Sequence, residues 1–151
     1  MSIFNRFYLV NNQMGAGHLA QQGPTFPVEI HVPSGLAQVM TQAGQPLPRP
    51  VSGMALFDTG ASVTCVDASV ITSLGVQPVG QGKVHTPSGE ANQSIFPARL
   101  SFPTMNFSMD FNAVFGANLA PQGIIALIGR DVLSNAVFTY NGPGGFVTLS
   151  F

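Results

Sequence analysis

The sequence predicts a mainly β protein, a small closed β-barrel with one or two short helices. Short apolar stretches recur along the chain, and turn residues separate them at close intervals. Glycine and proline are abundant, with 17 and 12 copies among 151 residues, and they disfavour long helices. A chain of this length is sufficient for one domain with one core.

The first part of the chain is predicted to be an arm followed by three strands. Residues 1–24 start apolar and become polar, which indicates an arm or an edge strand with a mobile end, ahead of a folded domain at 25–151. Residues 25–32 alternate between apolar and polar, as in a half-buried strand. The other two predicted strands are 36–40 and the continuous apolar run 54–57, on either side of a loop with three prolines.

The second part of the chain predicts a short helix and several hairpins. Asp67 can cap the start of a helix and Gly75 can close its end. Residues 87–90 form a turn sequence between strands 83–86 and 91–96. The remaining predicted elements are strands 98–102, 107–115 and 124–128, one or two helical turns at 129–134, and a final hairpin of 136–140 with 146–151.

Charge and composition exclude several classes of partner. Only 7% of the residues are charged, the net charge is −1, and the five basic residues are scattered, so we expect no nucleic acid and no membrane partner. No apolar run approaches the roughly 20 residues that span a bilayer, and the start has no secretory cleavage site, so we expect a cytoplasmic protein. A chain this apolar is expected to bury surface in an oligomer.

The histidines and the cysteine of the sequence do not predict a metal site. His18, His31 and His85 lack the spacing of a metal site, and we expect no cofactor. Cys65 is the single cysteine, which excludes an intrachain disulfide and fits a reducing compartment. Cys65 is expected to be a small buried residue, although its place near Asp58 leaves regulation by oxidation open.

Chemistry is indicated by the segment Leu56-Phe57-Asp58-Thr59-Gly60-Ala61-Ser62. Asp58 follows a buried apolar run directly and precedes a tight turn. A carboxylate held there needs hydrogen-bond donors or a shared proton, because burial of a lone charge is costly. Gly60 allows its N–H to approach that carboxylate, and the Thr59 hydroxyl is able to lock the loop.

This segment resembles the signature of aspartic peptidases, and the rest of the chain resembles their retroviral (retropepsin-like) branch. Ala126-Leu127-Ile128-Gly129-Arg130-Asp131-Val132-Leu133 is similar to the segment that precedes the last helix of those enzymes. The hairpin around residues 87–90 stands where that family has its flap. Order and spacing agree over roughly residues 25–151.

The resemblance implies a homodimeric aspartic endopeptidase that hydrolyses peptide or protein substrates. The chain has one Asp-Thr-Gly motif, so a second copy would supply the other carboxylate across a two-fold axis. The two Asp58 side chains would then hold one proton between them, activate a water and protonate the scissile carbonyl, with no metal and with an acidic to mildly acidic pH optimum.

The family pattern also implies roles for residues around Asp58. Thr59 would pair with its twin across the dimer axis, and Gly60 would offer its backbone to substrate. The expected substrate-binding residues are Gly60, Ala61, Ser62, His85, Pro87, Ser88 and Gly89, with the last three at the flap tip, although a solvated strand histidine is the simpler interpretation of His85.

Some residues depart from the family pattern or allow another interpretation. Ser62 replaces an acid that usually pairs with the arginine matching Arg130, and Arg130 with Asp131 is readily interpreted as a helix-start ion pair. The first rival is a non-catalytic dimerisation or peptide-binding module with the same fold. The second rival is a structural protein that packs into a larger assembly.

Overall fold

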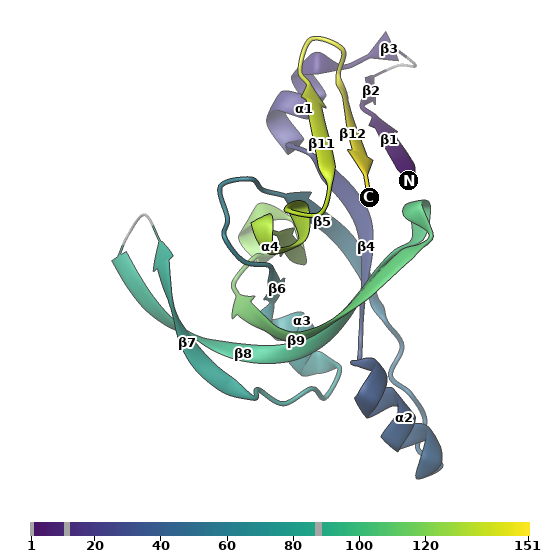
Figure 1. Cartoon of the computed structure of the whole chain (residues 1–151), viewed down its shortest axis with the longest axis vertical. Helices are drawn as coiled ribbons and strands as arrows, with labels where there is room; N and C mark the ends of the chain where they lie inside the picture. Colours follow the sequence, from purple (N-terminus) through teal and green to yellow (C-terminus); the bar gives the residue numbers. More distant parts are fainter. Residues whose placement is uncertain (1, 11–12, 87–88) are drawn as a thin grey trace.

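The computed structural model describes residues 2–10, 13–86 and 89–151 and is mainly β, as predicted (Figure 1). The strands are β1 (Ile3–Phe7), β2 (Leu9–Val10), β3 (Gln13–Met14), β4 (Thr25–His31), β5 (Val51–Phe57), β6 (Cys65–Asp67), β7 (Gly80–Thr86), β8 (Gly89–Phe102), β9 (Phe107–Ala117), β10 (Ala126–Ile128), β11 (Val137–Asn141) and β12 (Phe146–Ser150). The helices are α1 (Ala16–Gln22), α2 (Ser34–Gln42), α3 (Ala68–Ser73) and α4 (Arg130–Leu133), with 3-10 turns at Pro103–Met105 and Ala120–Gln122.

A closed barrel forms the body of the molecule. Its strands follow the order β4-β5-β10-β6-β9-β8-β7, and an additional pairing of β4 with β8 closes the sheet. β8 is long enough, at 14 residues, to pair with β4 and β9 in the barrel and then to continue outward as a hairpin with β7. An irregularity between Phe96 and Ala98 bends this strand at Pro97, which has no N–H to donate.

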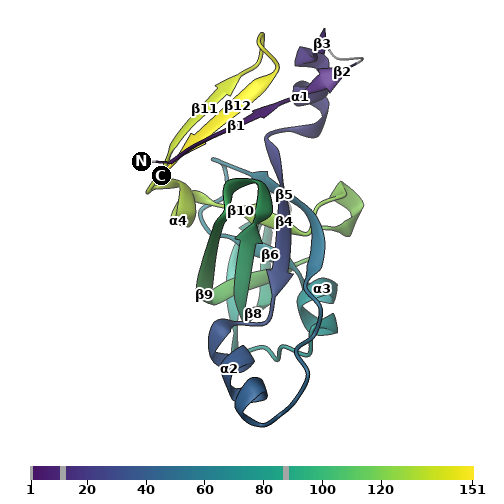
Figure 2. The same ribbon diagram turned by 90° about the vertical axis from the view of Figure 1, so that its right-hand side faces the viewer.

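A three-stranded sheet of order β1-β12-β11 lies at one end of the barrel (Figure 2). The chain termini meet there, because the Ser2 N–H donates to the Phe151 carbonyl at 3.1 Å and the Phe151 N–H returns a bond to Ser2 at 3.2 Å. Val147 and Leu149 of β12 are fully buried on the face toward the barrel. The first residues therefore add an edge strand to the final hairpin, one of the two forms predicted for the arm.

Phe57, the residue before Asp58, joins the barrel to this terminal sheet. Its ring centroid lies 5.1 Å from that of Phe26 on β4, 5.7 Å from Phe102 on β8 and 6.5 Å from Phe138 on β11. Such aromatic contacts stabilise packing beyond the area that they bury. The end of β5 is thus held from both sides, which positions the loop that follows it.

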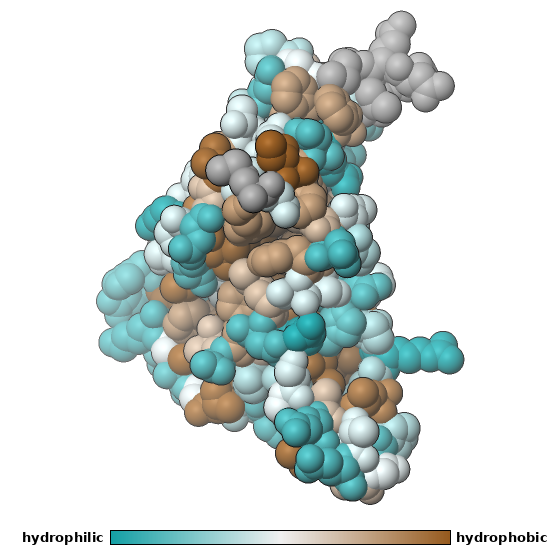
Figure 3. All heavy atoms as spheres, turned by 45° about the vertical axis from the view of Figure 1, so that its right-hand side comes forward, coloured by the Kyte–Doolittle hydropathy of each residue, from teal (hydrophilic) through white to brown (hydrophobic). Residues whose placement is uncertain are grey.

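Outside this core, apolar side chains also reach the surface over much of the face in Figure 3.

Two predictions about helices were wrong. Residues 36–40 are not a strand but lie in α2, where Leu36, Val39 and Met40 have the three-to-four-residue spacing of a helix. The start of α2 is held from a distance, since the Ser34 N–H donates to the Asp110 carboxylate at 2.9 Å. With α1 as a further unpredicted helix, the described residues contain four α-helices rather than one or two.

Asp67 caps α3 as predicted and also binds a second segment. It is 3% exposed, its Oδ1 accepts the N–H groups of Ser69 at 3.0 Å and Val70 at 3.3 Å, and its Oδ2 accepts those of Leu119 at 2.9 Å and Ala120 at 3.1 Å. Burial alone would raise the pKa of this carboxyl, but the hydrogen bonds from Ser69, Leu119 and Val70 outweigh burial and lower the pKa below its usual 3.8.

We expect Asp67→Ala to reduce the free energy of unfolding by about 3 kcal/mol at pH 7, because it removes a helix cap and leaves buried N–H groups unpaired. A lowered pKa in the folded state means that the contribution of Asp67 is complete above pH 3.8 and is lost as the pH falls through the folded-state pKa. Urea unfolding between pH 2 and pH 7 measures both effects. An unchanged acid limb of the stability profile in Asp67→Asn would contradict this account.

Candidate active site

Asp58 lies where β5 ends beside β10. The Asp58 N–H donates to the carbonyl of Ile128 at 2.9 Å, which continues the parallel pairing of these two strands into the loop. The Gly60 N–H donates to Asp58 Oδ1 at 2.7 Å, the contact that the sequence predicted for this glycine. The carboxylate is therefore oriented by its own turn and is only partly buried.

The second motif crosses directly behind this loop. A Cβ added to Gly129 would lie 2.6 Å from the carbonyl carbon of Val63, so a side chain larger than hydrogen does not fit there. The next two N–H groups bind the same loop, from Arg130 to the Ala61 carbonyl at 2.9 Å and from Asp131 to the Ser62 carbonyl at 3.3 Å. The Asp58 loop is thus fixed along its length by the chain at Gly129.

The side chains of Arg130 and Asp131 strengthen this arrangement separately. Arg130 Nη1 donates to the carbonyls of Thr59 at 2.8 Å and Gly60 at 3.1 Å, so it binds the backbone of the Asp58 turn in place of an acid at position 62. Asp131 accepts from the N–H and hydroxyl of Thr64 at 2.9 and 2.8 Å. The interpretation of these two residues as a helix-start ion pair was wrong, because each binds the loop instead.

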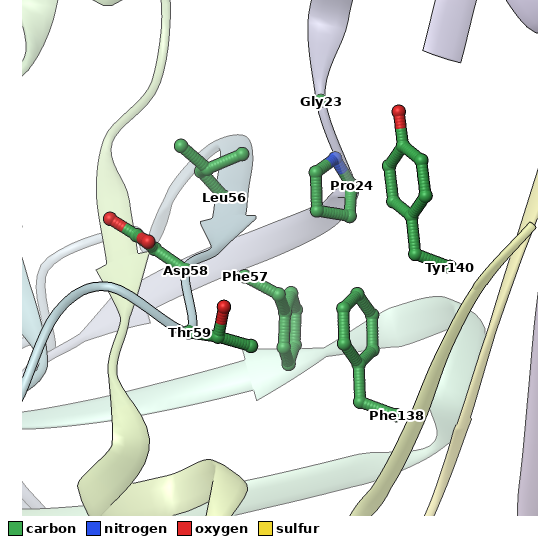
Figure 4. A pocket seen from close by; sticks show the side chains of 8 residues that line it. All are labelled: Gly23, Pro24, Leu56, Phe57, Asp58, Thr59, Phe138 and Tyr140. Atoms are coloured by element: carbon green, nitrogen blue, oxygen red, sulfur yellow. The ribbon is translucent and has the colours of Figure 1, made fainter. Parts of the chain in front are cut away.

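A cleft of about 560 Å³ opens beside Asp58 (Figure 4). Phe138 and Tyr140 project from β11 toward Pro24 and Phe57, with Asp58 and Thr59 on the other side of the cleft. The cleft combines one carboxylate with a largely apolar wall. Its lining residues are Gly23, Pro24, Leu56, Phe57, Asp58, Thr59, Phe138 and Tyr140.

The other five acidic side chains of the chain make contacts elsewhere. The chain has six acids in total. Asp67 and Asp131 bind backbone N–H groups, and Asp110 binds Arg99 and Ser34. Glu29 lies 3.3 Å from His31, and Glu90 lies 3.4 Å from Lys83. Asp58 is the acid in the cleft, so one copy of the chain presents one carboxylate there.

Of the remaining predicted site residues, the four that the structure describes are not part of the cleft lining: Ala61, Ser62, His85 and Gly89. Ala61 and Ser62 follow Asp58 in the same loop, and their carbonyls bind the chain at Arg130 and Asp131. His85 on β7 is well exposed and lies 3.7 Å from Glu90, while Gly89 begins β8 with a φ of 120°. Pro87 and Ser88 lie outside the described residues. Substrate contacts at all of these positions remain predictions.

Sequence reasoning missed the aromatic wall of the cleft. Phe138 and Tyr140 stand two positions apart on β11 and therefore share one face of the strand. That spacing was visible in the sequence, but which face points toward Asp58 depends on how the terminal sheet packs. Pro24 was missed for the same reason, since β4 brings it beside Phe57, whose N–H donates to the Pro24 carbonyl at 3.0 Å.

Cys65 lies in β6, which follows the Asp58 loop. Its side chain is partly buried, whereas the sequence predicted a buried residue. Burial, and secondly the negative charge of Asp131, raise the pKa of its thiol to about 11. We expect the folded protein to react with a disulfide reagent at pH 8 about 100-fold more slowly than the urea-unfolded chain, because the thiolate is the reacting form. Equal rates in the two states would contradict this environment.

Within residues 2–10, 13–86 and 89–151, no group of three or more His, Cys, Asp or Glu side chains is placed to hold a metal ion. Across that same part of the chain, no helix has the length and apolar character needed to cross a bilayer.

Comparisons with known proteins find solved structures that are similar to this one, but no match by sequence. No protein-family model matches the chain, and no curated protein matches it. The structure is similar to a retropepsin-like aspartic protease from Rickettsia conorii, at 14% identity and a TM-score of 0.48, over 98% of this chain and 91% of that one. It is similar to the simian foamy virus (mac) protease at 16% identity and a TM-score of 0.41, over 72% of this chain and 91% of that one.

A third likeness is to the foamy viral protease-reverse transcriptase, solved in complex with an RNA/DNA hybrid. The identity is 14% and the TM-score is 0.44, over 74% of this chain and only 12% of that one. All three likenesses are thus to structures that contain a protease, and each has a TM-score below 0.5.

Proposed function

We propose that this protein is an aspartic endopeptidase that works as a homodimer, with Asp58 of each copy contributing one half of the catalytic pair. The observation that carries the proposal is the oriented carboxylate of Asp58 at the edge of an open cleft, with no second free acid on the same chain. A single carboxylate has no partner with which to divide the roles of acid and base, so the site of one copy is incomplete.

The chemistry follows from two carboxylates at a two-fold axis. At a separation of about 3 Å, two negative charges repel strongly, so the pair retains one proton over a broad pH range. The ionised member takes a proton from a bound water, and that water attacks the scissile carbonyl carbon. The protonated member donates to the carbonyl oxygen. The Gly60 N–H, at 2.7 Å, holds one oxygen of Asp58 in place during the transfer.

The fixed loop positions the carboxylate of Asp58. Arg130 and Gly129 hold the Asp58 turn by the contacts described above, so the carboxylate does not have to be ordered when substrate binds. The apolar wall of Phe138 and Tyr140 favours peptides with hydrophobic side chains near the cleaved bond. The hairpin of β7 and β8 reaches outward from the barrel in Figure 1, and its predicted role is to close over a bound peptide.

Digestion of a peptide library, read by mass spectrometry, tests this function. We expect internal cleavage beside apolar residues, faster at mildly acidic pH, and inhibition by a pepstatin-like transition-state mimic. Binding of peptides without any cleavage would favour the rival of a non-catalytic binding module. Dimerisation with neither binding nor cleavage would favour a structural role.

A further inference from the structure

Three side chains from two strands meet on the outer face of the barrel. Glu29 and His31 stand two positions apart on β4 and point outward, because Ile30 between them is fully buried. Ser101 lies on β8, directly opposite Glu29 in the pairing of β4 with β8 that closes the barrel (Figure 2). The sheet therefore fixes the spacing of the three side chains.

The polar atoms of these side chains converge on one point. His31 Nε2 lies 2.8 Å from Ser101 Oγ and 3.3 Å from Glu29 Oε2. Ser101 Oγ lies 3.4 Å from the same carboxylate oxygen. With Glu29 ionised, the protons between these atoms can come only from the hydroxyl and from the imidazole nitrogen, whereas all three atoms carry lone pairs. The cluster is thus a set of acceptors that a cation would satisfy.

The spacing of the three atoms matches the coordination shell of zinc. Zinc binds imidazole nitrogen and carboxylate oxygen at about 2.0–2.2 Å, so the ligand atoms of a tetrahedral site lie roughly 3.3 Å apart. Two of the three separations, 3.3 and 3.4 Å, agree with that value. The third is the 2.8 Å hydrogen bond, which would lengthen by about 0.5 Å when the metal takes the place of the hydrogen.

The surroundings leave room for a divalent ion and do not repel it. The side chains of His31 and Glu29 are 29% and 33% exposed, and a cleft of about 290 Å³ beside Glu29 and Ser101 has space for a water ligand. Arg99 is the neighbour of His31 on β8, but it forms an ion pair with Asp110, which offsets its positive charge.

Other kinds of site fit this cluster less well. In a Ser-His-acid catalytic triad, the serine and the acid bind opposite nitrogens of the imidazole ring. Here Ser101 Oγ and Glu29 Oε2 both face Nε2 of His31, so the cluster lacks the geometry of a triad. Mg²⁺ and Ca²⁺ prefer shells of oxygen ligands alone, and the imidazole nitrogen therefore favours zinc.

We propose that Glu29, His31 and Ser101 bind a zinc ion, with water completing its coordination. The ion joins β4 to β8 across the closing pairing of the barrel and thereby stabilises the closed sheet. Because Ser101 is 70 residues away from His31, the spacing of the histidines in the sequence could not indicate this site.

The zinc site is separate from the proposed peptidase site. Ser52 pairs with Glu29 and precedes Asp58 by six residues, which corresponds to roughly 20 Å along an extended strand. The proposal therefore does not depend on peptide hydrolysis. Zinc binding by a chain that cleaves no peptide would support the zinc site and count against the peptidase, and an active peptidase without zinc binding would refute the zinc site alone.

Calorimetric titration of the full chain with zinc chloride tests the site. We expect saturable binding, and we expect His31→Gln to weaken it about 100-fold or more, because the change removes the nitrogen ligand. Glu29→Gln keeps the shape of the side chain, removes its charge and is expected to act similarly. Ser101→Ala is expected to weaken binding about tenfold, since a neutral hydroxyl is the weakest of the three ligands. Circular dichroism checks that each variant is folded.

His85→Gln is the matched control for these variants. His85 also lies near a glutamate, with its Nδ1 3.7 Å from Glu90, but Lys83 Nζ lies 3.4 Å from that glutamate and disfavours a second cation. We therefore expect His85→Gln to bind zinc as the parent does. No saturable binding by the parent, or binding that is lost in His85→Gln and kept in His31→Gln, would overturn the proposal.

Thermal unfolding gives a second measurement that is independent of peptidase activity. A ligand that binds only the folded chain, present at 100 times its dissociation constant, raises the unfolding midpoint of a domain of this size by roughly 5–10 °C. We expect this shift with zinc for the parent and for His85→Gln, and no shift for His31→Gln. An equal shift in all three proteins would place the bound zinc elsewhere and refute the site.

Discussion

Asp58→Asn is expected to abolish peptide hydrolysis, with a loss of at least about 1,000-fold in kcat. Asparagine has nearly the same shape, and its side-chain oxygen can still accept the Gly60 N–H that Asp58 Oδ1 accepts at 2.7 Å. It cannot take a proton from water at any pH used for assays. The variant therefore removes the chemistry and leaves the loop in place, and single-turnover cleavage of a peptide found in the library measures the loss.

Two measurements test whether the loss of activity in Asp58→Asn comes instead from unfolding or from loss of the dimer. The free energy of unfolding of Asp58→Asn is expected to stay within about 0.5 kcal/mol of the parent, because the side chain is partly exposed and keeps its bond to Gly60. The sedimentation profile is also expected to show a dimer. Cleavage at the parent rate by a folded, dimeric Asp58→Asn would exclude Asp58 as the catalytic carboxylate.

Gly129→Ala is expected to be the most damaging single-methyl change near the site. The added Cβ would lie 2.6 Å from the Val63 carbonyl carbon, 2.7 Å from its oxygen and 2.9 Å from its nitrogen. These are backbone atoms, so relief requires a shift of the Asp58 loop itself. We expect a loss of about 1–3 kcal/mol in the free energy of unfolding and about 100-fold in kcat, since a displacement near 1 Å is sufficient for that effect.

Gly35→Ala is the matched control for this change. A Cβ at Gly35 meets nothing within 4 Å, and the residue lies in α2, where alanine is favoured over glycine by about 1 kcal/mol. We therefore expect parent activity and equal or greater stability. Chemical denaturation and kcat are compared for both variants, and equal effects of the two substitutions would contradict the close approach at Gly129.

Local patterns in the sequence were sufficient to predict most of the strands of the barrel. The alternation of Phe26, Val28 and Ile30 matches their burial on β4, and the cap at Asp67 is where the side chain type predicted it. The oriented turn at Gly60 was predictable because a glycine two residues after an acid allows that hydrogen bond. These features depend on neighbours in the chain, which a sequence displays directly.

Features that depend on distant segments could not be predicted in the same way. The helix α2 was mistaken for a strand although its apolar spacing was helical, and its start is held by Asp110, 76 residues away. The strands predicted at 91–96 and 98–102 are one continuous strand, β8, bent at Pro97. The wall of Phe138 and Tyr140 depends on the packing of the terminal sheet against Phe57.

Subunit mixing tests the shared site most directly. Parent and Asp58→Asn chains are unfolded together, refolded at varied ratios and assayed at a fixed total concentration. If two Asp58 carboxylates must meet in one site, activity will fall as the square of the parent fraction, so a 1:1 mixture will retain about one quarter of the parent rate. A linear fall, with half of the rate retained at 1:1, would mean that each chain cuts peptides with its own Asp58 alone.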